Sequence, residues 1–203
     1  FSCTFCADGL ESKNRVTRFD QARVREELDY IQSRITGVDE IIITDLNFGM
    51  YKEDLETAKY IARIQEDKGW PVLVKASAGK NKPERLIEVA EVLKGSWMVG
   101  SAIQSSDDEV LKNIKRDNIS LDAYQDFLDF NKRLDKDAVT YTEVILGLPG
   151  DSKEKHFASL RYGIESGVDT VRAYQAILLP GTEMAEETTR KEFELLTRVR
   201  ILP

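Results

Sequence analysis

The sequence is poor in the residues that hold metals or form cross-links, with only two cysteines and one histidine among 203 residues. Cys3 and Cys6 lie too close together to cross-link a domain of this size, which excludes a disulfide-stabilised scaffold. A zinc site would need two further ligands, and His156 lies far away on a predicted helix. The cysteine pair therefore indicates thiolate or metal chemistry in a reducing compartment, and we expect a cytoplasmic protein.

Long apolar runs and an excess of basic residues are also missing. No stretch approaches the roughly 18 apolar residues of a membrane span, so we expect no membrane association. The formal net charge of −7 argues against nucleic acid as a partner, because proteins that bind the phosphate backbone usually present a basic face. An initiating methionine and a signal peptide are absent as well, so we expect a fragment of a longer chain, truncated before Phe1.

Short β-branched runs alternate with amphipathic segments along the whole chain, which is typical of βα units around a parallel sheet. The near-continuous apolar character of the strand candidates fits strands covered on both faces; they span 40–45, 71–77, 96–104, 140–147 and 170–178. Helical periodicity predicts helices over 22–35, 54–65, 82–94, 107–116, 121–134 and 153–164. The predicted fold class is α/β, with a ligand site at the C-terminal ends of the strands.

Polar residues gather at these strand ends, namely Asp45, Asn47, Lys75, Ser77, Gln104 and the segment 147–151. For Asp45 a helix N-cap, and for Lys75 a solvated charge, are alternative interpretations. Glu143 and Arg172 lie inside strands, where an uncompensated charge is costly, so we expect them to face a site or to pair with each other. His156 is expected on the exposed face of its helix.

The opening segment F-S-C-T-F-C resembles the end of the cluster-binding motif of the radical S-adenosylmethionine (SAM) superfamily, C-x-x-x-C-x-aromatic-C. The resemblance places the first cysteine two residues before Phe1, and Phe5 near the adenine of SAM. It implies that Cys3 and Cys6 bind two irons of a [4Fe–4S] cluster whose open iron binds SAM. Reductive cleavage of SAM would then give a 5′-deoxyadenosyl radical that abstracts hydrogen. Because the third cysteine lies outside the sequence, we expect the segment 1–8 to be held loosely.

Four further segments carry the resemblance: I-I-I-T-D-L-N-F-G, A-I-Q-S-S-D-D-E-V-L-K, E-V-I-L-G-L-P-G-D-S-K-E and L-L-P-G-T-E-M. It implies that Asp45 and Asn47 bind the amino group of SAM and that Ile145 and Gly147 flank its adenine. The remaining cofactor-binding residues that it implies are Lys75, Ser77, Gln104, Glu143 and Arg172. Gln104 stands where the family usually has glutamate, and Asp45-Leu46-Asn47 replaces Gly-Gly-Glu, a variant associated with cobalamin-linked members.

The resemblance identifies residues 1–203 as a radical SAM core domain, a partial (β/α)6 barrel of the TIM type whose first strand lies upstream. It implies an enzyme that acts on a small molecule and receives electrons from a flavodoxin or ferredoxin. Methyl transfer or cyclisation linked to cobalamin, held by an upstream domain, is the first choice. A methylthiotransferase-like enzyme acting on tRNA or protein is one alternative, and a catalytically silent, nucleotide-binding barrel without a cluster is the other.

Overall fold

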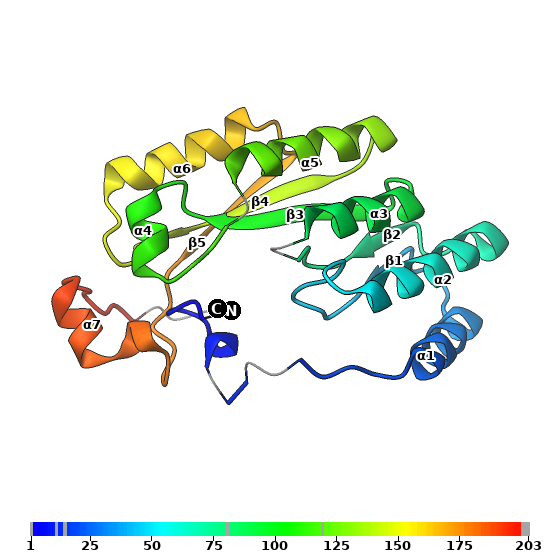
Figure 1. Cartoon of the computed structure of the whole chain (residues 1–203), viewed down its shortest axis with the longest axis horizontal. Helices are drawn as coiled ribbons and strands as arrows, with labels where there is room; N and C mark the ends of the chain where they lie inside the picture. The colour runs from blue at the N-terminus through cyan, green and yellow to red at the C-terminus, as the bar shows by residue number, and fades with distance from the viewer. Residues whose placement is uncertain (1, 11, 14–15, 80–81, 119, 200–203) are drawn as a thin grey trace.

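The computed structural model describes residues 2–10, 12–13, 16–79, 82–118 and 120–199, which form one curved parallel sheet with helices on its outer side (Figure 1). The strands pair in chain order and are β1 (Glu40–Ile42), β2 (Leu73–Lys75), β3 (Trp97–Gln104), β4 (Thr140–Leu146) and β5 (Thr170–Gln175). The helices are α1 (Gln21–Arg34), α2 (Lys52–Lys68), α3 (Pro83–Leu93), α4 (Asp108–Asn113), α5 (Leu121–Leu134), α6 (Lys153–Glu165) and α7 (Glu187–Glu192), with short 3-10 helices η1 (Ala7–Gly9) and η2 (Glu183–Ala185).

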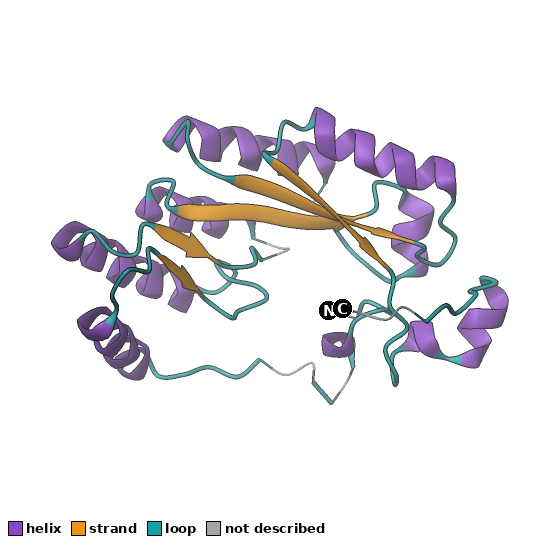
Figure 2. Cartoon of the chain, turned by 180° about the vertical axis from the view of Figure 1, so that it is seen from behind, coloured by secondary structure: helices purple, strands orange, loops and turns teal. Residues whose placement is uncertain are grey.

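This arrangement is an open, partial barrel. Every neighbouring pair of strands is parallel, as βα units require. Seen from behind, residues 16–20, which lead into α1, run on the side of the sheet opposite to the helices (Figure 2). The predicted α/β class and the five predicted strands are confirmed. The predicted strand upstream of Phe1 lies outside this sequence.

Except for β3, which ends at Gln104 as predicted, the strands end earlier than their apolar runs predict. The amide of Ile43 still donates to the carbonyl of Lys75, at 2.8 Å, but β1 then gives way to a turn that begins at Asp45. Beyond β5, the amide of Leu179 donates back to Ile177 in a tight turn. The ladder thus continues by one hydrogen bond beyond β1 and β5, at Ile43 and Ala176, and the apolar residues after these positions lie in loops.

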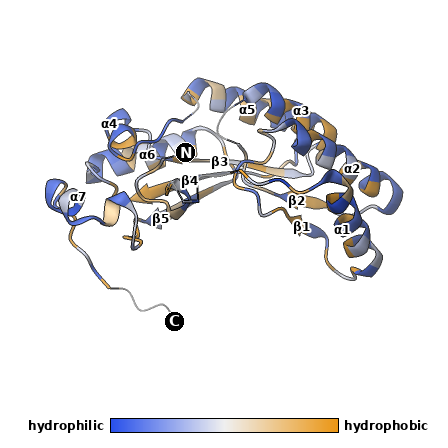
Figure 3. Cartoon of the chain, turned by 60° about the horizontal axis from the view of Figure 1, so that its bottom comes forward, coloured by the Kyte–Doolittle hydropathy of each residue, from blue (hydrophilic) through white to orange (hydrophobic). Residues whose placement is uncertain are grey.

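The main core lies between the sheet and the helices α2, α3 and α5. Trp97 of β3 is fully buried at its centre, with Phe48 packed edge-on at 5.5 Å between ring centroids and Phe127 at 6.5 Å. The indole N–H of Trp97 donates to the carbonyl of Ala76, so burial leaves it satisfied. Figure 3 shows hydrophilic residues on the outer surfaces of the helices and apolar residues along the strands.

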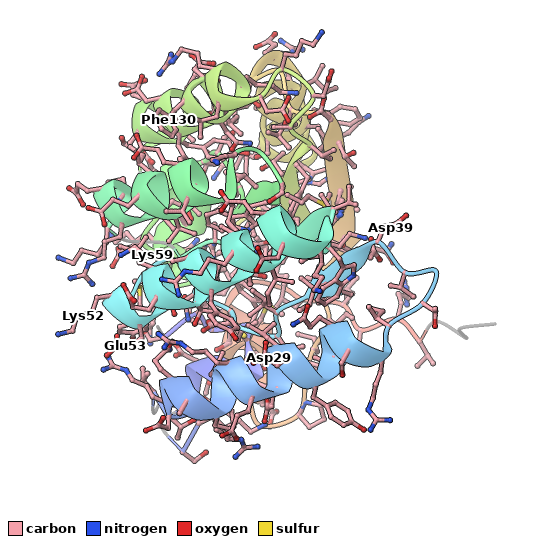
Figure 4. The ribbon with its side chains drawn as sticks, turned by 90° about the vertical axis from the view of Figure 1, so that its right-hand side faces the viewer. Asp29, Asp39, Lys52, Glu53, Lys59 and Phe130 are labelled. Carbon is pink, nitrogen blue, oxygen red and sulfur yellow. The ribbon has the colours of Figure 1, made fainter. Side chains whose placement is uncertain are left out.

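Polar contacts join α1 to α2 on the outside of this core. Figure 4 shows α1, α2, α3 and α5 as a row of helices, with Asp29 on the side of α1 that faces α2. The hydroxyl of Tyr60 on α2 donates to the Asp29 carboxylate at 2.8 Å. Arg18, before α1, pairs with Glu53 at the start of α2, with 3.0 Å between Nη1 and Oε1. Both contacts position the N-terminal segment, although exposed pairs of this kind add little stability.

Asp169 links the N-terminal ends of β4 and β5. Its Oδ2 accepts hydrogen bonds from both the amide and the hydroxyl of Thr140, each at 2.7 Å, and lies 2.9 Å from Nζ of Lys132. Although burial raises the pKa of Asp169, the hydrogen bonds from Lys132 and Thr140 outweigh it and lower this pKa to about 2. The carboxylate therefore fixes the register from which both strands run toward the site.

Helix α6 turns a different face to the sheet than its sequence predicts. His156, Ser159 and Gly163 are buried, and His156 is only 9% exposed, whereas Phe157 and Ile164 are 56% and 69% exposed. The prediction that His156 lies on an exposed face is therefore wrong. The reason is close approach, because a Cβ atom at Gly163 would lie within 3.1–3.4 Å of Thr142 and Val171, and only small residues fit there.

Candidate functional site

The ends of β1 and β2 form the first part of the site. Oδ1 of Asp45 accepts a hydrogen bond from the amide of Asn47 at 2.7 Å, which fixes the turn after β1. This turn leads to Phe48, whose amide donates to the carbonyl of Ser77 at 3.0 Å. The side-chain oxygen of Asn47 is buried without a hydrogen-bond partner. Asp45 therefore acts as a turn former and not as a helix N-cap, and Asn47 retains a free acceptor.

Lys75 and Ser77 lie at the end of β2. The ammonium group of Lys75 forms an ion pair with Glu40 of β1, and about a third of its side chain is exposed. Ser77 is exposed, and its carbonyl is engaged by Phe48. The Glu40 ion pair thus balances the charge of Lys75 within the sheet.

Gln104 ends β3 in a strained backbone conformation. Its φ of 63° lies in the left-handed region, which residues other than glycine seldom occupy. The side chain is buried, and its oxygen Oε1 has no hydrogen-bond partner. Strain and an unsatisfied buried acceptor in one residue are typical of a binding site.

Glu143 of β4 and Arg172 of β5 are partners in the sheet register and form an ion pair, with 3.4 Å between Oε1 and Nη1. The guanidinium of Arg172 also lies 4.1 Å from the ring centroid of Tyr141, within the range of a cation–π contact. Burial, and then the charge of Glu143, raise the pKa of Tyr141. The expectation that Glu143 and Arg172 pair with each other is confirmed.

A turn follows β4 at Gly147. Its φ of 82° favours glycine, and a Cβ atom there would meet no protein atom within 4 Å. Its amide donates to Oδ2 of Asp151 at 3.1 Å, and the same oxygen lies 4.0 Å from Nδ1 of His156. The hydrogen bond from Gly147 to Asp151 therefore stabilises the turn, and the space on the Cβ side of Gly147 stays open.

The cysteine loop is anchored over the ends of β3, β4 and β5. The amide of Thr4 donates to the carbonyl of Ile114, at the end of α4, and its carbonyl accepts from the amide of Met184 in η2. Cys3 is 6% exposed, and Cys6 is partly buried. The expectation of a loosely held segment is thus wrong for its described residues, because backbone hydrogen bonds anchor Thr4 on both sides.

Phe5 and Ile145 pack against one apolar cluster, which contains Val110, Ile114, Leu148 and Met184. The structure therefore brings two of the residues predicted near the adenine to the same cluster, beside the turn at Gly147. The predicted residues as a whole fall into two groups. The residues at the ends of β1 and β2 form one group. The residues in or directly after β3, β4 and β5 form the other group, together with the cysteine loop.

Arg116 is the residue of the site that the sequence did not reveal. It is 6% exposed, and its Nη1 lies within hydrogen-bonding distance of Cys3 Sγ, at 3.9 Å. Burial lowers the pKa of Arg116, while the neighbouring sulfurs of Cys3 and Cys6 raise it. The predicted helix 107–116 hides this position, because α4 ends at Asn113 and Lys115 then adopts a left-handed φ of 51°.

The residues present fit part of an iron–sulfur site. Two thiols come from one short loop, and a buried cation lies beside one of them, as an anionic cluster with thiolate ligands favours. Within the described ranges, no group of three His, Cys, Asp or Glu residues is placed to hold a metal ion. The chain thus offers two of the three thiolates that the motif contains.

Comparison with known proteins places the chain in a family. The model of the "Radical SAM superfamily" matches residues 1–189. The chain is 30% identical over 187 residues to a 2-(S-pantetheinyl)-carbapenam-3-carboxylate methyltransferase of Streptantibioticus cattleyicolor, covering 89% of this chain and 26% of that protein. It is 28% identical to the cobalamin-dependent radical SAM methyltransferase TokK of Streptomyces tokunonensis, covering 97% of this chain and 29% of TokK. The chain thus spans less than a third of the length of these relatives.

The fold also resembles a solved structure, the radical SAM methyltransferase TsrM of Kitasatospora setae with cobalamin and a [4Fe–4S] cluster bound. The TM-score is 0.71 at 17% identity, over 91% of this chain and 34% of that one. At this identity the likeness concerns the fold alone.

A further finding concerns membranes: in the part of the chain that is described, no helix combines the length and apolar character that a crossing needs.

Proposed function

Because the chain belongs to the radical SAM superfamily and is an enzyme of this class, we propose that its reaction is a cobalamin-linked methyl transfer to a small molecule. The observation that carries the proposal is the cysteine loop, which Thr4 anchors over the C-terminal ends of the strands, where ligands bind in such barrels. The two methyltransferase relatives favour methyl transfer over cyclisation.

The cluster belongs at Cys3 and Cys6, with a third cysteine supplied by the residues before Phe1. When bound, it supplies the electron that cleaves the S–C5′ bond of SAM, giving methionine and a 5′-deoxyadenosyl radical. Phe5 and Ile145 form an apolar wall for the adenine, beside the open space at Gly147. These residues exclude water and orient SAM with respect to the sheet.

The remaining polar groups bind the other parts of SAM. Asp45 and the free side-chain oxygen of Asn47 accept from its amino group, because both present oxygen acceptors at the end of β1. The unsatisfied Gln104 oxygen offers a further acceptor. Lys75, Ser77, Glu143 and Arg172 line the adjoining surface. Cobalamin is held outside this chain, and a flavodoxin-like or ferredoxin-like protein supplies electrons.

Anaerobic reconstitution tests the cluster. Protein expressed with its natural flanking sequence should bind about four irons and four sulfides and absorb broadly near 400 nm, with bleaching by dithionite. Cys3→Ala and Cys6→Ala should abolish the cluster. Ser2→Ala, an exposed position in the same loop, should retain it. Wild-type protein that takes up zinc and no iron would refute the cluster, and would favour the catalytically silent barrel.

Product analysis tests the reaction type. Transfer of a SAM methyl group to cobalamin leaves S-adenosylhomocysteine, and hydrogen abstraction from the substrate by the radical of a second SAM leaves methionine and 5′-deoxyadenosine, so the proposed reaction consumes two SAM molecules and gives both products. With SAM, a low-potential reductant and hydroxocobalamin, the reconstituted enzyme should form S-adenosylhomocysteine only when the cobalamin is present. Formation of 5′-deoxyadenosine alone, unaffected by cobalamin, would contradict methyl transfer through cobalamin. Sulfur insertion into an added tRNA or protein substrate, with sulfide supplied as the sulfur source, would establish the methylthiotransferase alternative instead.

A further inference from the structure

Arg116 is held rigidly between β3 and the cysteine loop. Its Nε donates to Oδ1 of Asn118 at 2.7 Å, and its Nη2 donates to the carbonyl of Ala102. Asn118 is itself fixed, because its Nδ2 donates to the carbonyl of Ile103 at 2.7 Å. The third contact, from Nη1, is the one to Cys3 Sγ. Two of the three guanidinium nitrogens are thus held by protein oxygens, and the third, Nη1, is directed toward the cysteine sulfur.

The charge of Arg116 has no carboxylate ion pair among the described residues. Its oxygen partners are a carbonyl and a side-chain amide, both neutral, and the attraction from Glu143 is weaker than that from the sulfurs of Cys3 and Cys6. A buried guanidinium without a counter-charge destabilises the folded protein, because the charge has lost its hydration and gains no ion pair in return. The sulfur of Cys3, 3.9 Å from Nη1, becomes an anionic partner for Arg116 once it binds iron as a thiolate.

We propose that Arg116 is a positioning residue that donates a charge-assisted hydrogen bond to the Cys3 sulfur and raises the reduction potential of the bound cluster. This inference rests on the proposed function. Uptake of one electron makes the cluster more negative by one charge, so a fixed positive charge beside a ligand sulfur stabilises the reduced form. Arg116 thus makes the electron transfer from a low-potential donor protein more favourable.

Redox titration of the reconstituted, naturally flanked protein, followed by electron paramagnetic resonance, measures this effect directly. Arg116→Gln keeps a hydrogen-bonding side chain and removes the charge, whereas Arg116→Lys keeps the charge and removes the planar fork. Arg116→Gln should lower the ratio of reduced to oxidised cluster at least tenfold at a fixed potential, which is about 59 mV for one electron. Arg116→Lys should lower it less.

Lys115→Gln is the matched control, because this neighbour points to solvent and pairs with Glu183, with 2.7 Å between Nζ and the carboxylate. It should leave the potential unchanged. A full cluster with an unchanged potential in Arg116→Gln would overturn the inference. Loss of the cluster from both Arg116 variants, with a lowered melting temperature, would also overturn it and indicate a purely structural role. Loss from Arg116→Gln alone supports it, whereas a wild-type protein without iron refutes the proposed function itself.

Discussion

The ring of Tyr141 on β4 lies against the backbone of Gly100 on β3, in the space that a Cβ atom at residue 100 would occupy. The two residues are partners in the sheet register, and the guanidinium of Arg172 lies over the same ring, 4.1 Å from its centroid. Glycine at this position therefore leaves room for the aromatic ring beside the backbone of β3. The ion pair of Arg172 with Glu143 depends on that support.

Gly100→Ala is accordingly expected to displace Tyr141 and to lower the free energy of unfolding by about 1–3 kcal/mol, the usual range for overpacking. Urea unfolding measures the loss. In a Tyr141→Leu background the same substitution should cost much less, because the ring is gone. Equal costs in the two backgrounds would show that the contact is not the cause.

Asp169 predicts a specific acid sensitivity. Its pKa in the folded protein is about 2, below the ordinary value of 3.8, so its contribution is complete above pH 3.8 and is lost as the pH falls through 2. Asp169→Asn should therefore be less stable than wild type at pH 7, and the difference should shrink between about pH 4 and pH 2. Urea midpoints across this range measure it. A difference independent of pH would contradict the role of the charge.

The SAM site can be tested one strand end at a time. Asp45→Ala removes a charge-assisted hydrogen bond and should weaken SAM binding by roughly 1.5–3 kcal/mol, or about ten- to a hundredfold. Asp39→Ala, at the opposite end of β1, is the matched control. Isothermal titration of the reconstituted protein measures both, and the iron content should stay unchanged in each.

Gly147→Val should also weaken SAM binding, for two physical reasons. Its side chain would enter the open space beside the turn, and a β-branched residue is strained at a φ of 82°. Isothermal titration separates the effect on SAM from stability, which unfolding reports. If Gly147→Val and Asp45→Ala both bind SAM like wild type, the assignment of the strand ends is wrong even with the cluster in place.

His156→Ala tests the buried face of α6. The imidazole lies in a tight, polar environment with Asp151, so its loss should lower the free energy of unfolding by about 1–3 kcal/mol. Phe157→Ala, the exposed neighbour, should change it by about 0.5 kcal/mol or less. A larger loss in Phe157→Ala than in His156→Ala would mean that α6 docks through its apolar face in the native protein.

The sequence predicts the order and type of the main elements, because the apolar periods of strands and helices are strong over these lengths. It fails where a tertiary contact overrides the local pattern. The face that α6 turns to the sheet is determined by the close approach of Gly163 to β4 and β5. The hydrophobic periodicity of the sequence does not reveal such a contact. Polar composition hides α7, a short helix of six residues, E-T-T-R-K-E.

The candidate site shows the same division. Cys3, Asp45 and Gly147 belong to short local motifs, and the structure places each at the sheet edge that its motif implies. Arg116 belongs to no such pattern, because its burial follows from the left-handed turn at Lys115 and from bonds to β3. A basic residue just after a helix that follows a strand end is the one signal that would have drawn attention to it.

The hydrogen bonds of Thr4 also constrain the order of biosynthetic events. They join the cysteine loop to Ile114 and to Met184, so this loop reaches its final place only after synthesis has passed residue 184. Contacts between residues so far apart in the sequence form late in folding, because closing the long loop between them costs conformational entropy. We therefore expect iron–sulfur assembly at Cys3 and Cys6 to follow synthesis and folding of the domain as far as η2, because a nascent chain that stops before Met184 lacks one of the two backbone hydrogen bonds that hold Thr4.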